Sequence, residues 1–213
     1  MSRETFVIVG GSTLAAATRY KLRMAALHDL TTYTAAPGRI AELVEAYAVQ
    51  GDHVRLVGAW TCEFGDLNRL LVLQSQPPDA EVTPDFHHEV LRAVERRRLR
   101  LARPLQLDGP AGVVEFRTYS IRPGDLQTYL GRMLAALPFR ERYSRNIGVW
   151  TPMDGDVDQV LHLWGYADIS DRMRARTGAF ADEDWRRYIA TIYSLMRRMN
   201  SQILLPTRFS PLK

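Results

Sequence analysis

A short segment around residue 162 carries side chains able to bind and transform a small molecule. His162 and Trp164 lie two residues apart in a run that alternates as a β-strand does, so both point to one face. Tyr166 continues that row, whereas leucines occupy the opposite face. An imidazole changes protonation near neutral pH and can act as a general base when partly shielded from water. The spacing therefore predicts His162 as a catalytic base, with Trp164 and Tyr166 contacting the substrate.

A second polar row precedes it, formed by Glu115, Arg117 and Tyr119 at alternate positions. If the two segments pair as neighbouring strands, a Glu–Arg pair there can bind an enol or a carboxylate, and Tyr119 can donate a hydrogen bond to it. These three residues complete the predicted catalytic set. The alternative is that His162 is hydrogen-bonded to one of them and only closes the sheet, because buried polar groups are normally paired whether or not they act.

The elements that position these rows follow from two marks that each occur twice. Thr-Tyr at 32–33 with Pro-Gly at 37–38 returns at 118–119 and 123–124, an offset of 86 residues from Tyr33 to Tyr119. Gly-x-Trp-Thr at 58–61 returns at 148–151, an offset of 90 residues from Trp60 to Trp150. Two landmarks in the same order, with a slip of about one helical turn between them, indicate two copies of one structural unit.

Each copy is predicted to run strand, helix, strand, strand, helix, strand. In the first copy we expect strands at 29–34, 54–61, 68–73 and 101–102 and helices at 39–49 and 86–99. In the second copy we expect strands at 114–121, 147–151, 157–166 and 203–205, a helix from residue 126, and closing helices near 170–180 and 183–199.

This order is that of the ferredoxin-like motif, so the predicted fold class is α+β with tandem ferredoxin-like units that form a dimeric α/β-barrel type of pseudo-dimer. The predicted parts are an N-terminal extension (1–23), a first unit (24–107), a linker (108–112) and a second unit (113–213). The interior between the two sheets is the expected place for a small apolar ligand. Trp60 and Trp150 sit at equivalent places in the copies, which favours core packing over ligand stacking.

The second copy resembles the NIPSNAP family. The resemblance rests on Glu-Phe-Arg-Thr-Tyr at 115–119, Gly-Val-Trp-Thr at 148–151, Gln-Val-Leu-His-Leu-Trp at 159–164 and the ending 203–212. It implies the dimeric α/β-barrel fold, which antibiotic-synthesis monooxygenases, muconolactone isomerases and haem-degrading enzymes share, without fixing a reaction. The family usually has Asn where this chain has Asp158, and the first copy has Val72-Leu73 in place of His-Leu. One pocket near the second copy is therefore expected, with Asp158, Trp60, Trp150 and Tyr33 as further substrate-contact candidates.

Composition restricts the function classes. The 213-residue chain has a net charge of only +4 and no basic stripe with interleaved aromatics, so nucleic-acid binding is not expected. Cys62 is the single cysteine and has no basic neighbour in sequence, so neither an intrachain disulfide nor a cysteine nucleophile is expected. The sequence shows no secretory signal and no membrane span, which predicts a cytoplasmic protein without membrane contact.

Three further motifs have ordinary interpretations. Adjacent His87 and His88 diverge by about 100° on a helix, so 85–89 is interpreted as a solvated helix start and no metal site is predicted. The arginine run at 96–98 is interpreted as an exposed helix face. The segment 6–12 resembles the start of a dinucleotide-binding fold but lacks a glycine and a free second strand, so no such cofactor is expected.

Together these patterns predict a cytoplasmic homodimer that acts on a small molecule without a tightly held cofactor. The expected reaction is proton transfer, rearrangement or oxygenation of an aromatic or polyketide-like metabolite, with His162, Tyr119, Arg117 and Glu115 as the site. The alternative is a non-catalytic ligand-binding or scaffolding NIPSNAP protein.

Overall fold

The structure is a computed structural model that describes residues 26–77 and 86–213. The predicted N-terminal extension 1–23, with the glycine-containing segment 6–12, lies outside these residues, as does Asp85.

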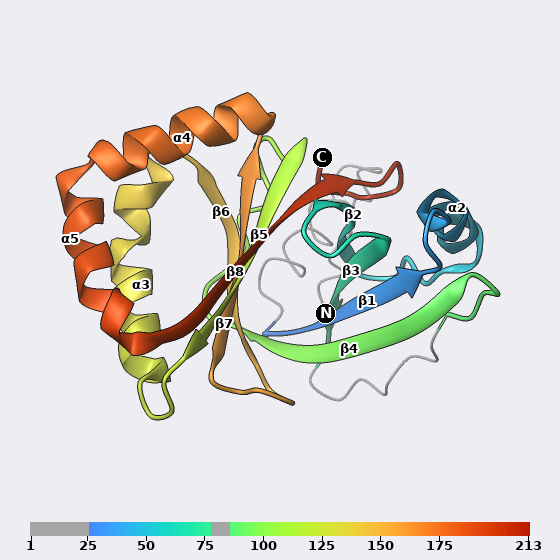
Figure 1. The fold of residues 1–213 in the computed structure, drawn as a ribbon, viewed down its shortest axis with the longest axis horizontal. Helices are drawn as coiled ribbons and strands as arrows, with labels where there is room; N and C mark the ends of the chain where they lie inside the picture. Colours follow the sequence, from blue (N-terminus) through green and yellow to red (C-terminus); the bar gives the residue numbers. More distant parts are fainter. Residues whose placement is uncertain (1–25, 78–85) are drawn as a thin grey trace, which may run out of the picture.

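Eight antiparallel strands close into one barrel in the order β1-β3-β2-β8-β5-β7-β6-β4 (Figure 1). The two halves meet at two seams, where β2 pairs with β8 and β4 pairs with β6. The predicted α+β class, with two ferredoxin-like units forming a barrel-type pseudo-dimer, is confirmed. The strands are β1 (Leu27–Ala35), β2 (Leu56–Phe64), β3 (Arg69–Gln76) and β4 (Leu91–Leu101) in the first half, and β5 (Val113–Ile121), β6 (Arg145–Pro152), β7 (Gln159–Tyr166) and β8 (Met196–Pro206) in the second.

Of the described helices, more pack on the second half than on the first. In the second half α3 (Leu126–Glu141), α4 (Ile169–Ala181) and α5 (Glu183–Ile192) lie together on the outer face of the strands, and in the first half α2 (Ile40–Gln50) lies on the far side of the barrel (Figure 1). Asp168 and Asp182 cap α4 and α5 by accepting the amide hydrogens of Asp171 and Trp185. Among the described residues, no helix combines the length and apolar character needed to cross a bilayer.

The strand register matches the two offsets of the sequence marks. Thr31 of β1 lies opposite Val72 of β3, and Arg117 of β5 lies opposite His162 of β7. These positions differ by 86 residues between β1 and β5 and by 90 between β3 and β7. Val72 therefore occupies in the first half the place that His162 occupies in the second.

The prediction of a helix at 86–99 is wrong. Residues 86–90 are irregular and Leu91–Leu101 form β4, which pairs with β1 over most of its length. Arg, Ala, Leu and Glu favour a helix locally, but the edge of β1 requires a partner strand, and the long-range ladder decides. The arginine run therefore lies on a strand, where Arg98 donates to both carboxylate oxygens of buried Asp29 at 2.8 and 2.9 Å.

The closing helix is also shorter than predicted. It ends at Ile192, a 3₁₀ turn follows at Tyr193–Leu195, and Met196–Pro206 form β8. Ile121 of β5 already faces Met196, so pairing with β5 draws residues 196–199 out of the helical pattern. The amphipathic spacing of this segment correctly predicted the apolar face of α5 but not its end.

The barrel interior is filled by side chains, so the expectation of a ligand there is wrong. Trp60 and Trp150 lie in this core, and a void of only about 10 Å³ remains, about the space of one water molecule. The irregular segment between β4 and β5 adds Leu105 and Leu107 to this core. The C-terminal residues complete it with Leu212. The remaining core members are Leu30, Val57, Cys62, Leu71, Leu73, Leu99, Ala111, Val114, Ile147, Leu161, Leu163 and Leu204.

Candidate active site

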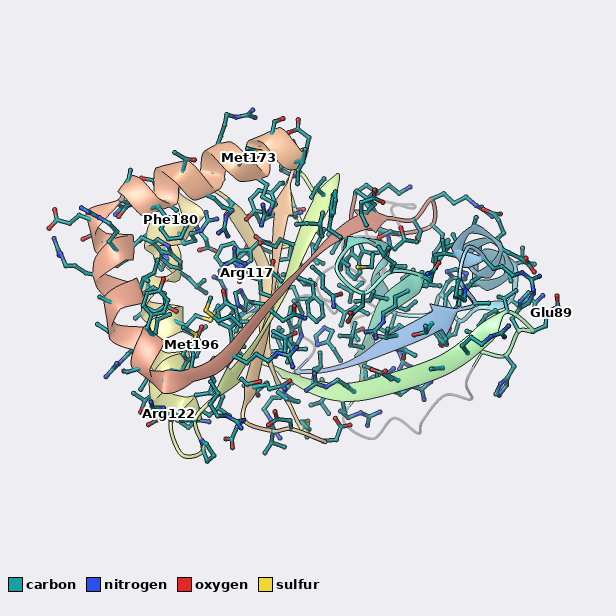
Figure 2. All side chains as sticks on the ribbon, in the orientation of Figure 1. Glu89, Arg117, Arg122, Met173, Phe180 and Met196 are labelled. Carbon is teal, nitrogen blue, oxygen red and sulfur yellow. The ribbon has the colours of Figure 1, made fainter. Side chains whose placement is uncertain are left out.

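The polar rows lie on the outer face of the second half, under its three helices. A cavity of about 90 Å³ lies between strands β5 and β7 and the helices α3, α4 and α5. Arg117, Tyr119 and His162 line it from the sheet, and Figure 2 shows Arg117 in this space with Phe180 and Met196 on the same side of the sheet. The other lining side chains are mostly aromatic or aliphatic: Tyr129, Met133, Trp164, Ala179, Trp185, Tyr188, Ile189, Ile192, Tyr193 and Met199, with Arg140 and Arg176.

His162 is held in one tautomer by its neighbour on the strand. The indole nitrogen of Trp164, which can only donate, lies 2.6 Å from Nδ1 of His162. Nδ1 is therefore the acceptor, and the proton of the neutral ring is on Nε2. Complete burial, with Arg117 nearby, lowers the pKa of His162 to about 3, so the ring stays neutral at physiological pH. Nε2 is buried and has no hydrogen-bond partner within the part of the chain that the structure describes.

This geometry suits His162 for donating a hydrogen bond rather than for removing a proton. A ring with a pKa of about 3 is a weak base at neutral pH, whereas its Nε2–H is a preorganised donor to an oxygen that gains charge. Tyr119 packs edge-on against the imidazole at 4.8 Å. Its phenol oxygen accepts a hydrogen bond from Arg117 Nη1 at 2.9 Å, which leaves the phenolic proton for donation.

Glu115 anchors the cluster from behind the cavity. Its fully buried Oε1 accepts from Arg117 at 2.9 Å, Arg172 at 2.6 Å and Ser201 at 2.8 Å, while Oε2 accepts from the Tyr166 hydroxyl at 3.3 Å. Burial alone would raise the pKa of Glu115, but the charge of Arg117 and these hydrogen bonds lower it to about 2. A saturated carboxylate of this kind positions arginines and does not take up protons at neutral pH.

Sequence reasoning missed three arginines that complete the site. Arg140 of α3 is buried, donates to the Tyr166 hydroxyl at 3.3 Å and lies 5.0 Å above the Trp164 ring. Arg172 and Arg176 of α4 reach Glu115 Oε1 at 2.6 and 3.7 Å. A signal existed in the sequence, since Arg140 lies on the same helical face as buried Met133 and Leu137, an unusual place for an unpaired charge.

The other predicted contact residues lie apart from the cavity. Trp60 and Trp150 are in the barrel interior, on the opposite face of the sheet. Tyr33 packs against Tyr47 in the core under α2. Asp158 ends the β5–β7 pairing through its carbonyl, which accepts the amide hydrogen of Ile121 at 2.7 Å. Tyr166 lies behind the cavity, where it links Arg140 to Glu115.

The described residues of the first half, 26–77 and 86–107, form no equivalent constellation. Asp29 takes the place of Glu115, and Val72 and Gln74 take those of His162 and Trp164. Cys62, on β2, is buried, its Sγ lies 3.4 Å from the carbonyl of Phe64, and burial raises the pKa of its thiol. A reactive thiolate is not favoured there.

Comparison with known proteins identifies the family of this chain. The family model described as NIPSNAP matches residues 114–211. A solved NIPSNAP family protein from Agrobacterium tumefaciens is 32% identical over 51% of this chain and 97% of its own, with a TM-score of 0.47. The chain belongs to the NIPSNAP family.

NipSnap homolog 2 of Danio rerio is 32% identical over 110 residues, which are 52% of this chain and 38% of that protein. A NipSnap protein of Caenorhabditis elegans is 21% identical over 88% of this chain and 41% of that relative. This NIPSNAP chain thus spans about two fifths of the length of these curated relatives.

Longer structural matches cover both halves. An anthrone oxidase-like protein superposes with a TM-score of 0.64 over 90% of this NIPSNAP chain and 96% of its own, at 12% identity. A candidate monooxygenase from Lactobacillus acidophilus NCFM gives a TM-score of 0.63 over 85% of the chain and 94% of its own, at 9% identity. At such identities the likeness establishes the fold alone, a closed α/β barrel, and leaves the chemistry to the site.

Proposed function

We propose that this NIPSNAP protein is a small-molecule enzyme whose active site is the cavity between β5, β7 and helices α3, α4 and α5. Its substrate is an aromatic or polyketide-like metabolite, and its reaction is proton transfer, rearrangement or oxygenation without a tightly held organic cofactor. The observation that carries the proposal is the Nε2–H of His162, which is buried, unpaired and held in one tautomer at the cavity wall. A buried donor without a partner in the protein calls for an acceptor, which a water molecule or a bound substrate oxygen can supply.

The chemistry that fits this wall is stabilisation of an enolate or phenolate. His162 and Tyr119 both line the cavity, where each has a proton left for donation, and Arg117 adds a fixed positive charge beside Tyr119. A carbonyl oxygen placed here is stabilised more as it becomes an oxyanion, which lowers the barrier to transfer of the adjacent proton to a water molecule. The resulting carbanion can rearrange or react with dioxygen, so the substrate decides which of the two follows.

A second candidate function, ligand binding without catalysis, is supported by the absence of a strong base among His162 and Glu115. Glu115 is saturated with donors, and His162 has a pKa of about 3, so neither takes a proton at neutral pH. A substrate with an unusually acidic C–H or O–H needs no strong base. A substrate without one would only be bound, which is the behaviour of a non-catalytic ligand-binding or scaffolding protein.

Turnover of anthrone, an aromatic ketone with an acidic ring CH₂, tests the proposal. Anthrone is the first substrate to test because an anthrone oxidase-like protein has the same fold. Oxygen uptake and absorbance are followed for the native chain, for His162→Ala and for His87→Ala, a control at an exposed histidine of the other half. We expect His162→Ala to lower kcat/KM by about 10²-fold or more, as for loss of one oxyanion donor, with the control unchanged. Equal turnover by His162→Ala contradicts the proposal, and binding without turnover across a panel of enolisable aromatics favours the second candidate.

The homodimer and the cytoplasmic location stay predictions from the sequence. The barrel is closed within one chain, so a second copy is not needed to complete the sheet around the site. Light scattering on the purified chain measures the assembly state directly.

A further inference from the structure

The cavity carries more positive charge than its own carboxylate can balance. Four guanidinium groups, from Arg117, Arg140, Arg172 and Arg176, surround the single carboxylate of Glu115. Among the described residues no other carboxylate forms an ion pair with these arginines. Buried ionic groups are normally paired, because an isolated charge in a poorly polar site is costly.

Glu115 cannot serve all four arginines. Arg117, Arg172 and Ser201 already occupy its Oε1 at hydrogen-bond distance, and Arg176 Nη1 stays 3.7 Å away. Arg140 does not reach the carboxylate, and contacts it only through the Tyr166 hydroxyl. Two charges of the cluster, those of Arg140 and Arg176, are therefore without a direct hydrogen-bonded anion.

These two arginines are also the ones that face the cavity from the helices. Both line it, and Nη1 of Arg140 is buried and finds no hydrogen-bond partner in residues 26–77 and 86–213. Burial lowers the pKa of both guanidiniums, and the like charge of Arg117 acts in the same direction. Arg140 is partly compensated by the faces of Trp164 and Trp185, at 5.0 and 6.0 Å, and by the Tyr166 hydroxyl that accepts from its Nη2, which leaves Nη1 for another acceptor.

We propose that the cavity binds an aromatic carboxylate, whose anionic group is held by Arg140 and Arg176 and whose ring contacts Trp164, Trp185 and Phe180. Guanidinium groups recognise carboxylates through charge-assisted, often bidentate hydrogen bonds. The aromatic walls supply the apolar contact that an arene ring needs. The inference rests on the proposed function for its cavity, and makes the substrate an aromatic acid, with the acid at the helices and the reacting oxygen at His162.

Binding of benzoate and of benzamide tests this assignment. The two have the same ring and nearly the same shape and differ in charge. Calorimetric titration of each is carried out with the native chain, with Arg176→Gln and with Arg174→Gln. Arg174 is the matched control, since it lies on α4 but is exposed and paired with Asp171.

We expect benzoate to bind at least about tenfold more tightly than benzamide, and Arg176→Gln to remove about tenfold of that affinity while Arg174→Gln leaves it unchanged. Equal affinity for the two ligands, equal loss in both variants, or no benzoate binding overturns the inference. Arg140→Met gives a second test, with thermal unfolding as a check that the variant still folds.

The binding and turnover experiments together distinguish a failure of the proposed anion site from a failure of the proposed enzyme activity. If benzoate binds through Arg176 but no enolisable aromatic is turned over, the anion site is supported and the proposed enzyme activity is contradicted. If neutral anthrone is turned over by the native chain and not by His162→Ala, while benzoate neither binds nor inhibits, the proposed enzyme activity is supported and the anion site is contradicted.

Discussion

Replacing Glu115 by glutamine tests the charge cluster that organises the site. The carboxylate is completely buried and accepts four hydrogen bonds, three of them at Oε1. Glutamine keeps the shape of the side chain but removes the negative charge, so the surrounding guanidiniums lose their only direct counter-ion among the described residues. Breaking a buried ion pair from one side typically costs about 3–5 kcal/mol of folding free energy.

The pKa of the carboxyl gives an independent magnitude. The ordinary value is 4.5 and the folded value is about 2, and at 1.36 kcal/mol for each pH unit this gap corresponds to about 3 kcal/mol. Because the folded pKa is depressed, this stabilisation is fully present above pH 4.5 and is lost as the pH falls through 4.5 toward 2. The two routes agree on a loss of roughly 3 kcal/mol at neutral pH.

Urea unfolding at several pH values between 7 and 3, followed by tryptophan fluorescence, measures both effects. Glu115→Gln is expected to lower the free energy of unfolding by about 3 kcal/mol at pH 7, and the difference from the native chain should shrink toward pH 3. Glu45→Gln is the control, since Glu45 forms an exposed pair with Arg208. A difference that stays constant with pH, or a Glu115→Gln chain as stable as the control, would refute the reasoning.

Three further predictions concern the histidine, the barrel core and the chain end. The ring protons of His162 should show no titration by NMR between pH 5 and 8, because its pKa is about 3; a midpoint near 6.5 would contradict the assigned burial and tautomer. Trp150→Ala should lower the free energy of unfolding by about 3–5 kcal/mol without changing benzoate affinity, since Trp150 lies inside the barrel and away from the cavity; weaker benzoate binding would show that the two faces are coupled. Ser210→Ala should cost about 1–3 kcal/mol, because the buried amide of Ala59 then loses the acceptor that lies at 3.0 Å; an unchanged unfolding midpoint would show that this amide finds another acceptor.

The residues that sequence reasoning placed correctly are those fixed by local alternation. The spacing of His162 and Trp164 on one row and of Glu115, Arg117 and Tyr119 on another follows from the period of a strand, and β5 and β7 pair as expected. Alternation does not tell which face of a strand turns inward. The sequence therefore predicts a ligand in the barrel interior, whereas the leucines fill that space and the polar row lies under the helices.

The errors have one physical cause, which is that distant partners override local preference. Residues 91–101 are rich in helix-forming arginine, alanine and leucine, yet they form β4 because β1 pairs with them. In the same way Arg140 and Arg176 join the site only through the packing of α3 and α4 on the sheet, a relation that helical periodicity alone does not contain. The role of His162 as donor depends on the 2.6 Å contact from Trp164, which no spacing rule predicts.

The shared register of the two halves has a consequence for stoichiometry. A barrel assembled from two copies of one half-length chain necessarily has two identical sites, and every substitution alters both at once. Here β1 and β3 carry Asp29 and Val72 where β5 and β7 carry Glu115 and His162, so among the described residues the proposed site occurs in one half only. A titration should accordingly saturate at one ligand per chain, with a hyperbolic curve.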